Sequence, residues 1–435
     1  MLGEPATLKE ALESSDAEEW KKAMESELKS IEENGTWELK ALYGLKQAPR
    51  LWYLKLREVL EIGFTPLSAD HSLFMLGEGE QRSFMVVYVD DILIFSPSSE
   101  LVKEVMLKLQ DKFKCKALGD VIFYLGLHIE RHVEKRCMRV HQRKYLECVK
   151  GPEEESVGEE ERRHFHSLVS SLMYAAVNTR PDVAFATRQL ARVVQCHNEE
   201  QVAAGMRVAK YLGQTPTVGL QYSAAAQRRQ KGADGVKPRR LCLTAFSDTS
   251  YASKPEDITS VGGFICCVGG GPTTWESKKQ VDQALSSVES EYMALFRAVR
   301  EIVWQRHLLA ELGEEQQGPT PLYCGSQGAI ALAKNPVLHG LTKHMRVKWH
   351  WTRSTVAAGE VELSYVKTSG HPADMMIKRL VEEQHWKCCK LAGMALTERA
   401  RSQGQQSEGE FVGATLRFAL GLLSMCVHAC VHGMV

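Results

Sequence analysis

The spacing of apolar positions separates helical from extended segments along the chain. Two β-branched and aromatic runs, 84–89 and 92–95, are separated by turn-forming aspartates, which predicts a β-hairpin with Asp90 and Asp91 at its tip. Residues 121–131 predict a further strand. Apolar residues at helical spacing predict helices over 7–34, 49–61, 98–114, 166–177, 182–195 and 199–213.

The order of elements changes near residue 240. Residues 223–240 have the composition of a linker, and the charged run 152–164 predicts another linker or an exposed loop. The later part predicts a long amphipathic helix over 288–312, two further helices, and strands over 241–246, 262–268, 273–278, 321–324 and 361–366. Strands and helices in this order predict an α/β unit.

Composition limits the class of protein. The 435 residues are 44% hydrophobic and 25% charged, as in an ordinary globular protein. The formal net charge is zero, so binding to a polyanion requires a local basic patch. Twelve cysteines without a CxxC pair indicate reduced thiols and a cytoplasmic or nuclear location.

The two ends of the chain give little support for a membrane protein. The first twenty residues are acidic and lack the apolar core of a signal peptide. In the segment 411–435, the uninterrupted apolar run 418–427 is about half of the ~20 residues that a spanning helix needs. A tail-anchored membrane protein is therefore the least favoured of our alternatives, and we expect no membrane partner.

Two adjacent aspartates are an unusual choice for a simple turn because their charges repel. Mg²⁺ prefers carboxylate oxygens together with substrate phosphates, so a metal site would explain the pair Asp90 and Asp91. A surface turn with solvated aspartates explains the hairpin alone equally well.

The surrounding motifs carry a resemblance. The run Ala41-Leu-Tyr-Gly-Leu-Lys-Gln-Ala-Pro-Arg50 precedes the box Tyr88-Val-Asp-Asp91, and Phe123-Tyr-Leu-Gly-Leu127, Gln142-Arg-Lys-Tyr145 and Thr179-Arg-Pro-Asp182 follow. This arrangement resembles the reverse transcriptase domain of copia-type retrotransposon Pol polyproteins. The resemblance implies that Asp90 and Asp91 are metal-binding polymerase residues. It also implies that substrate or nucleic acid contacts Lys46, Gln47, Arg50 and Tyr88.

The second half resembles the ribonuclease H domain of the same family. Asp248 ends the first strand, Glu291 lies in the first turns of the long helix, and Asp374 lies near the end of the domain. The resemblance implies that these acids, with Glu291 rather than Glu289, hold Mg²⁺ or Mn²⁺ and cleave the RNA strand of an RNA–DNA hybrid. Each acid alone also fits an ordinary role, as a turn residue, a first-turn acid or a helix cap.

The sequence departs from the family pattern at functional positions. Thr36-Trp-Glu-Leu-Lys40 runs directly into Ala41, where the family has a long segment with the fingers and the first polymerase aspartate. Gly325-Ser326 stands where the family has an Asp-Asn pair, and residues 146–160 are shorter than the family pattern. Because two-metal catalysis needs a full ligand set, we predict that both activities are absent or very weak in this internally truncated copy.

Nucleic-acid binding without catalysis is the alternative function. Lys343 and Arg346 belong to a basic segment interleaved with Trp349 and Trp351, a composition that suits phosphate contacts and base stacking. A solvated helix whose tryptophans enter the core fits this segment equally well. The expected partners are RNA, DNA and RNA–DNA hybrid, with deoxynucleotides if the polymerase is active.

We therefore predict an α/β (α+β) fold. It comprises a truncated reverse transcriptase palm and thumb module followed by a ribonuclease H-like mixed sheet flanked by helices. The predicted segments are an N-terminal reverse transcriptase remnant (1–40), the palm and thumb part (41–150), a helical connection (151–222), a linker (223–240), the ribonuclease H-like domain (241–380) and a variable tail (381–435).

Overall fold

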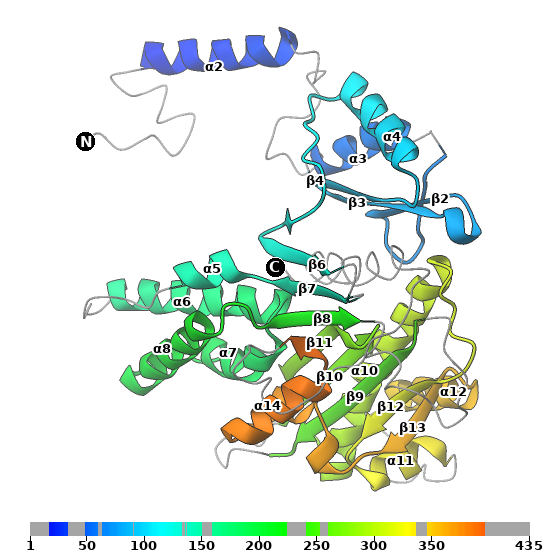
Figure 1. Cartoon of the computed structure of the whole chain (residues 1–435). Coiled ribbons are helices and arrows are strands. Elements are labelled where there is room, and N and C mark those ends of the chain that lie inside the picture. The colour runs from blue at the N-terminus through cyan, green and yellow to red at the C-terminus, as the bar shows by residue number, and fades with distance from the viewer. Residues whose placement is uncertain are drawn as a thin grey trace. The chain divides into compact units, whose positions relative to one another are not determined.

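The computed structural model describes most of the chain (Figure 1). It forms two compact units, Met1–Thr65 with Ser98–Leu118, and Pro66–Pro97 with Gly119–Val435. The described residues are 17–33, 48–59, 63–89, 91–132, 135, 137–149, 159–223, 241–252, 260–335 and 346–395. The predicted linker 223–240, apart from residue 223, and the apolar tail 411–435 lie outside these residues.

The described residues of the first unit form the helices α2 (Ala17–Glu33), α3 (Ala48–Val59) and α4 (Ser99–Lys112). Helix α4 begins where the Ser98 hydroxyl accepts a hydrogen bond from the Leu101 amide. The ring of Trp52 on α3 packs edge-on against Phe113, with centroids 5.0 Å apart. The predicted helix over 7–34 is confirmed from Ala17 onward, and the residues before it lie outside the described part.

The predicted hairpin is confirmed in the second unit. Strands β3 (Ser83–Tyr88) and β4 (Asp91–Phe95) pair antiparallel, and β2 (Leu73–Leu76) pairs with β3. Strand β1 (Thr65–Pro66) lies at the boundary of the units, and a 3₁₀ turn, η1, covers Gly79–Gln81. Asp91 pairs with Tyr88 and begins β4, so it lies in a strand and not at the tip of the hairpin as predicted. Val89 has a φ of 51°, which is unfavourable for a β-branched residue.

A second sheet follows in the order β14-β8-β7-β6-β5. The strand predicted over 121–131 is wrong as a single element, since it is split by a turn at Leu125 and Gly126, whose φ angles are 47° and 79°. Residues on both sides of this turn are apolar, so the spacing of apolar residues in the sequence does not reveal it. The strands are β5 (Phe123–Tyr124), β6 (Leu127–His132), β7 (Cys137–His141), β8 (Gly219–Ser223) and β14 (Met394–Ala395).

The chain between β7 and β8 is mainly helical. Helix α6 begins at Glu159, so the charged run predicted as a linker or loop over 152–164 is helical in its second half, and its acidic residues suit a helix N-terminus. The predicted helix over 182–195 is shorter than expected and opens with a 3₁₀ turn. The elements are α5 (Arg143–Cys148), α6 (Glu159–Asn178), η2 (Pro181–Val183), α7 (Ala184–Ala191) and α8 (Glu199–Gln214), the last begun by an Asn198–Gln201 capping box.

A five-stranded mixed sheet, in the order β11-β10-β9-β12-β13, forms the centre of the C-terminal part. Strands β11, β10 and β9 pair antiparallel, and β9, β12 and β13 pair parallel. The strands are β9 (Leu243–Ser250), β10 (Val261–Val268), β11 (Gly271–Lys279), β12 (Thr320–Cys324) and β13 (Val361–Tyr365). The helical elements are α10 (Ser287–Glu311), α11 (Gln327–Lys334), α12 (Arg346–Ala357), η5 (Thr368–Gly370), α13 (Asp374–Ile377) and α14 (Glu382–Leu391).

Two glycines let helices approach both faces of this sheet. A side chain at Gly262 would contact Ala294 of α10 at 3.5 Å, and one at Gly263 would clash with Met376 of α13 at 2.4 Å. Successive strand residues point to opposite faces, so α10 and α13 cover opposite faces of β10. The predicted mixed sheet flanked by helices is therefore confirmed.

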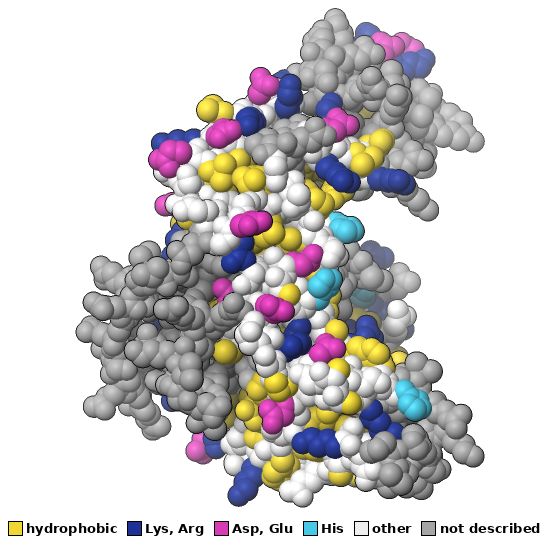
Figure 2. Space-filling model, turned by 90° about the vertical axis from the view of Figure 1, so that its right-hand side faces the viewer, with side chains coloured by type: hydrophobic (Ala, Val, Ile, Leu, Met, Phe, Trp, Pro, Cys, Tyr) yellow, Lys and Arg dark blue, Asp and Glu magenta, His cyan; other side chains and the backbone are white. Residues whose placement is uncertain are grey.

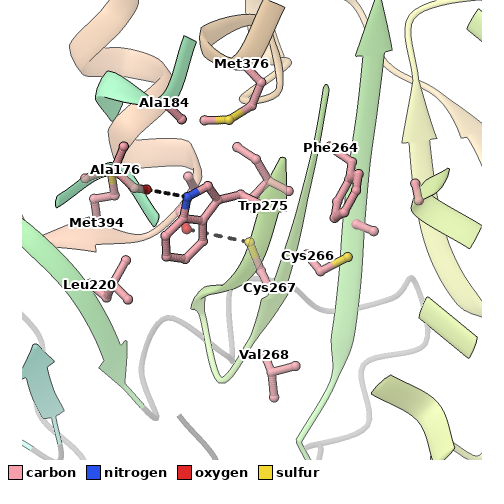
Figure 3. Close-up of a cluster of buried hydrophobic side chains, with 14 of the residues drawn as sticks. Ala176, Ala184, Leu220, Phe264, Cys266, Cys267, Val268, Trp275, Met376 and Met394 are labelled. Carbon is pink, nitrogen blue, oxygen red and sulfur yellow. Dashed lines mark hydrogen bonds between the residues drawn. The ribbon is translucent and has the colours of Figure 1, made fainter. Parts of the chain in front are cut away.

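Figure 3 shows how this sheet joins the preceding helices. Trp275 of β11 is buried, and its indole Nε1 donates a 2.8 Å hydrogen bond to the Ala176 carbonyl of α6. The Cys267 thiol points to the Ala392 carbonyl, and β14 pairs with β8. One continuous apolar core therefore links the mixed sheet to the middle helices. Among the described helices, none is long and apolar enough to cross a membrane.

Candidate active site

Three predicted carboxylates meet beside strand β9. Asp248 lies near the end of β9, Glu291 in the first turns of α10, and Asp374 at the start of α13. The carboxyl of Asp248 lies against those of both Glu291 and Asp374. Asp248 and Asp374 are buried, and Glu291 is half-buried. Residues that lie up to 126 positions apart in the sequence are thus brought to one site by the sheet and the helices on its two faces.

The start of α10 determines which glutamate faces the site. The Ser286 hydroxyl accepts from the Glu289 amide, and the Glu289 carboxylate accepts a 2.7 Å hydrogen bond from the Leu285 amide. Glu289 is therefore occupied in closing the first turn of the helix. Glu291, two residues later, is directed to Asp248.

Burial and the neighbouring negative charges disfavour the ionised form of the carboxyls in this cluster. Burial and the neighbouring Asp248 carboxylate raise the pKa of Glu291 well above its ordinary value. Burial and contact with Asp248 raise the pKa of Asp374 to about 6. The Lys378 ammonium opposes this shift through an ion pair with Asp374 Oδ1 at 2.8 Å. The cluster is therefore a place where a further positive charge is favourable.

Sequence reasoning missed two residues that complete the surroundings of the cluster. Lys378 lies one helical turn after Asp374, and this i, i+4 spacing was the available signal. His371 is buried, and its Nε2 donates to the Ser247 carbonyl at 3.1 Å, which fixes the backbone beside Asp248. Burial lowers the pKa of His371 to about 4, so the imidazole is neutral near pH 7. No sequence pattern indicated that role.

Gly325 follows β12 and lies beside the same cluster. A side chain built there would lie 3.7 Å from Asp248 Oδ1 and 3.7 Å from the His371 ring, which is ordinary van der Waals contact. The next residue, Ser326, begins α11 by accepting a hydrogen bond from the Ala329 amide. The position where the family pattern places an aspartate therefore faces Asp248, but it carries no side chain.

The donor chemistry fits a hard divalent cation, but the ligand set is incomplete. Asp374 Oδ2 is buried and accepts no hydrogen bond from the described residues, which leaves a carboxylate oxygen available. Within the described part of the chain, however, no group of three or more His, Cys, Asp or Glu side chains is arranged to hold a metal ion. The three acids thus need a fourth ligand or a rearrangement to form a metal site.

The predicted polymerase residues are only partly described. Asp91 begins β4 and is exposed, Tyr88 ends β3 and is half-buried, and Arg50 is an exposed residue of α3 in the other unit. Asp90, Lys46 and Gln47 lie outside the described residues. The metal-binding role of the aspartate pair stays a prediction.

The predicted basic segment is also partly described. Lys343 lies outside the described residues, as does the side chain of Arg346, the first residue of α12. The ring of Trp351 packs edge-on against Phe296, and Arg353 donates to the Leu332 carbonyl, so both side chains turn toward the protein. On the face drawn in Figure 2, basic and acidic side chains are interspersed, in keeping with the zero net charge.

Comparison with known proteins identifies the family. A sequence profile described as "Reverse transcriptase (RNA-dependent DNA polymerase)" matches residues 21–152. The Pol polyprotein of transposon RE1 from Arabidopsis thaliana is 33% identical over 362 residues, which cover 78% of this chain. The chain belongs to the reverse transcriptase family of retrotransposon Pol polyproteins. The family generally uses divalent metal ions.

Another relative and a solved structure also match this chain. The Pol polyprotein of transposon TNT 1-94 from Nicotiana tabacum is 30% identical over 82% of this chain and 28% of its own length. The chain spans about a quarter of the length of such polyproteins, 24% for RE1. Among solved structures, a foamy viral protease-reverse transcriptase in complex with double-stranded DNA matches with a TM-score of 0.41 at 13% identity, over 74% of this chain and 49% of its own.

Proposed function

We propose that the C-terminal part of this family member binds RNA–DNA hybrid at Asp248, Glu291 and Asp374 and hydrolyses the RNA strand only weakly. The observation that carries the proposal is the position of Gly325. It lies beside Asp248, in a cluster that also holds Glu291 and Asp374, whose carboxyl pKa values are raised. Removing one carboxylate from a two-metal site weakens the hold on at least one ion.

We assign a separate role to each residue of the cluster and its surroundings. Asp248, Glu291 and Asp374 would hold Mg²⁺ or Mn²⁺, which when bound supplies Lewis-acid activation of a water and stabilises the leaving oxygen. Neutral His371 keeps the backbone at Ser247 in place, which orients Asp248. Lys378 keeps Asp374 ionised by its ion pair and adds positive charge for a substrate phosphate.

The experiment is a cleavage assay on an RNA–DNA hybrid with the purified full chain and Mn²⁺ or Mg²⁺. We expect Gly325→Asp to raise the cleavage rate at least about tenfold, equivalent to about 1.4 kcal/mol of barrier. Gly325→Asn is the matched control, because it has nearly the same shape without the charge. Glu291→Gln in the Gly325→Asp background should abolish the gain.

Two results would contradict the proposal. Robust cleavage by the unaltered chain would show that Gly325 is no defect. Equal rates for Gly325→Asp and Gly325→Asn would show that charge at this position is not what the site lacks. Tight hybrid binding with a steep salt dependence but no cleavage by any variant would favour the non-catalytic binding function instead.

For the first half we propose that RNA-directed DNA synthesis is absent. The family pattern places fingers and a further aspartate between Lys40 and Ala41, which are adjacent here. Without that third carboxylate, Asp90 and Asp91 lack a ligand from the other flank of the metals. Primer extension on an RNA template, abolished by changing both aspartates to asparagine, would contradict this. We propose a cytoplasmic or nuclear location, because the cysteines among the described residues are free thiols.

A further inference from the structure

A cavity of about 1160 Å³ opens between the middle helices and the segment that follows α13. Its lining comes from η2, α7, α8 and residues 379–386, which include the start of α14. It does not include Asp248, Glu291 or Asp374, so it is a separate feature from the carboxylate cluster. Its volume exceeds the roughly 300–1,000 Å³ of typical small-molecule sites.

The base of the cavity is rigidly built. Arg180 is fully buried, and its guanidinium donates to both carboxylate oxygens of Asp182 at 2.9 and 2.7 Å and to the carbonyl and hydroxyl of Thr215. The Tyr211 hydroxyl donates to Asp182 at 2.7 Å, and His385 Nε2 donates to the Asp182 carbonyl. Arg180 therefore neutralises Asp182, and the base holds a fixed shape without a net negative charge.

The rim of the cavity combines two arginines and one acid, Glu382, with aromatic rings. Arg207 on α8 and Arg379 are exposed, and neither guanidinium has an ion pair or hydrogen bond within the described part of the chain. The half-buried rings of Phe185 and Trp386 line the same cavity. Arginines that neutralise phosphates beside rings on which bases stack are the components of a single-strand nucleic-acid site.

The cavity begins close to the carboxylate cluster. Asp374 starts α13, Lys378 pairs with Asp374, and Arg379 lines the cavity. Five residues span at most about 17 Å even when fully extended. At about 3.4 Å per nucleotide of one strand, that is a distance of about five nucleotides. A strand passing the carboxylates can therefore reach Arg379.

We propose that this cavity binds a single-stranded RNA segment that continues from the hybrid held at the carboxylates. This proposal rests on the proposed function, because it assumes that a hybrid is bound at the carboxylates. The segment in the cavity is single-stranded, since the bases of a duplex are stacked and cannot enter a pocket. Phe185 and Trp386 stack on unpaired bases, and Arg207 and Arg379 contact the adjoining phosphates. The site therefore distinguishes a hybrid with a single-stranded RNA overhang from a blunt one.

The test measures RNA binding by fluorescence anisotropy of a labelled 12-nucleotide single strand, with the full chain in EDTA. No metal or hydrolysis is needed, so failure of the proposed cleavage leaves this test intact. We expect Arg207→Gln with Arg379→Gln to lower the slope of log K against log salt by about 1.4, at about 0.7 per phosphate contact. Trp386→Leu should weaken binding about 5- to 150-fold, as for the loss of one stacked base.

Matched controls lie on the same elements. Lys210 on α8 and Lys387 on α14 are exposed and do not line the cavity. Lys210→Gln with Lys387→Gln removes the same charge and should leave the salt slope unchanged. Thermal unfolding of each variant verifies folding, and the arginine pair, being exposed, keeps the test valid if Trp386→Leu fails to fold.

Three results would overturn the proposal. The first is an equal effect of the arginine and lysine pairs, which would show general electrostatic attraction. The second is hybrid cleavage with the same affinity for blunt and overhanging substrates, which would leave the proposed function standing and remove only this site. The third is a rise in RNA affinity of more than tenfold on deleting residues 396–435, with no effect of the arginine pair, which would show that the cavity holds the chain's own tail.

Discussion

Replacing Asp248 by asparagine should make the metal-free protein more stable. Asp248 lies against both Glu291 and Asp374, and its charge raises the pKa of each. Asparagine keeps the Oδ1 acceptor that receives the 2.9 Å hydrogen bond from the Thr249 amide, and it removes the charge. The site thus carries a stability cost that serves cation binding.

The magnitude follows from the pKa of Asp374. Its rise from 3.8 to about 6 corresponds to about 3 kcal/mol at about 1.4 kcal/mol per unit. Burial is the largest cause of this shift, so we assign only about 1 kcal/mol of the 3 kcal/mol to the charge of Asp248. With the matching effect on Glu291 included, we expect the Asp248→Asn protein to be more stable by about 1–2 kcal/mol. Because the pKa is raised in the folded state, the wild-type protein loses stability as pH rises through about 6.

Urea unfolding at pH 4 and pH 7 measures this effect. At pH 7, Asp248→Asn should raise the free energy of unfolding by about 1–2 kcal/mol. At pH 4, where Asp374 and Glu291 are largely protonated, the gain should nearly vanish. Saturating Mn²⁺ should stabilise the wild type more than the variant. Destabilisation at pH 7, or the same gain at both pH values, would refute the repulsion argument.

Two further substitutions test the structure away from the cluster. Asp182→Asn leaves the Arg180 guanidinium buried and incompletely paired, and should lower the free energy of unfolding in urea by about 3–5 kcal/mol. Asp111→Asn, at an exposed ion pair, should change this free energy by less than about 0.5 kcal/mol. A comparable loss at both sites would contradict the argument. Trp275→Phe leaves the Ala176 carbonyl without its donor and should lower the free energy of unfolding by about 1–3 kcal/mol. An unfolding transition unchanged from the wild type would show that this hydrogen bond does not stabilise the packing of the mixed sheet on α6.

Local patterns predicted the elements well, because they depend on periodicity and end signals. The hairpin, the buried strand Val261–Val268 and the long helix Ser287–Glu311 follow from residue type and spacing. The split at Leu125 was missed because apolar residues continue through the turn, and only its positive φ reveals it. The convergence of Asp248, Glu291 and Asp374 was implied by resemblance to the family and not by spacing.

The rest of the site depends on tertiary contacts that one sequence does not contain. Buried Arg180 lies in a motif that alone is more often an ordinary helix start. Two of its four hydrogen bonds exist only because Thr215, at the end of a later helix, packs against it. The hydrogen bond of His371 joins residues 124 positions apart. The turn of Arg353 toward the Leu332 carbonyl likewise required the packing of α12 on α11.

The number of Mn²⁺ ions bound in the presence of RNA–DNA hybrid shows whether the carboxylate cluster lacks a metal ligand at Gly325. Electron paramagnetic resonance counts free Mn²⁺ and gives this number for the full chain and for Gly325→Asp. We expect the unaltered chain to hold fewer than two ions at millimolar Mn²⁺, Gly325→Asp to gain one, and Gly325→Asn to gain none. Two tightly held ions on the unaltered chain would contradict this expectation.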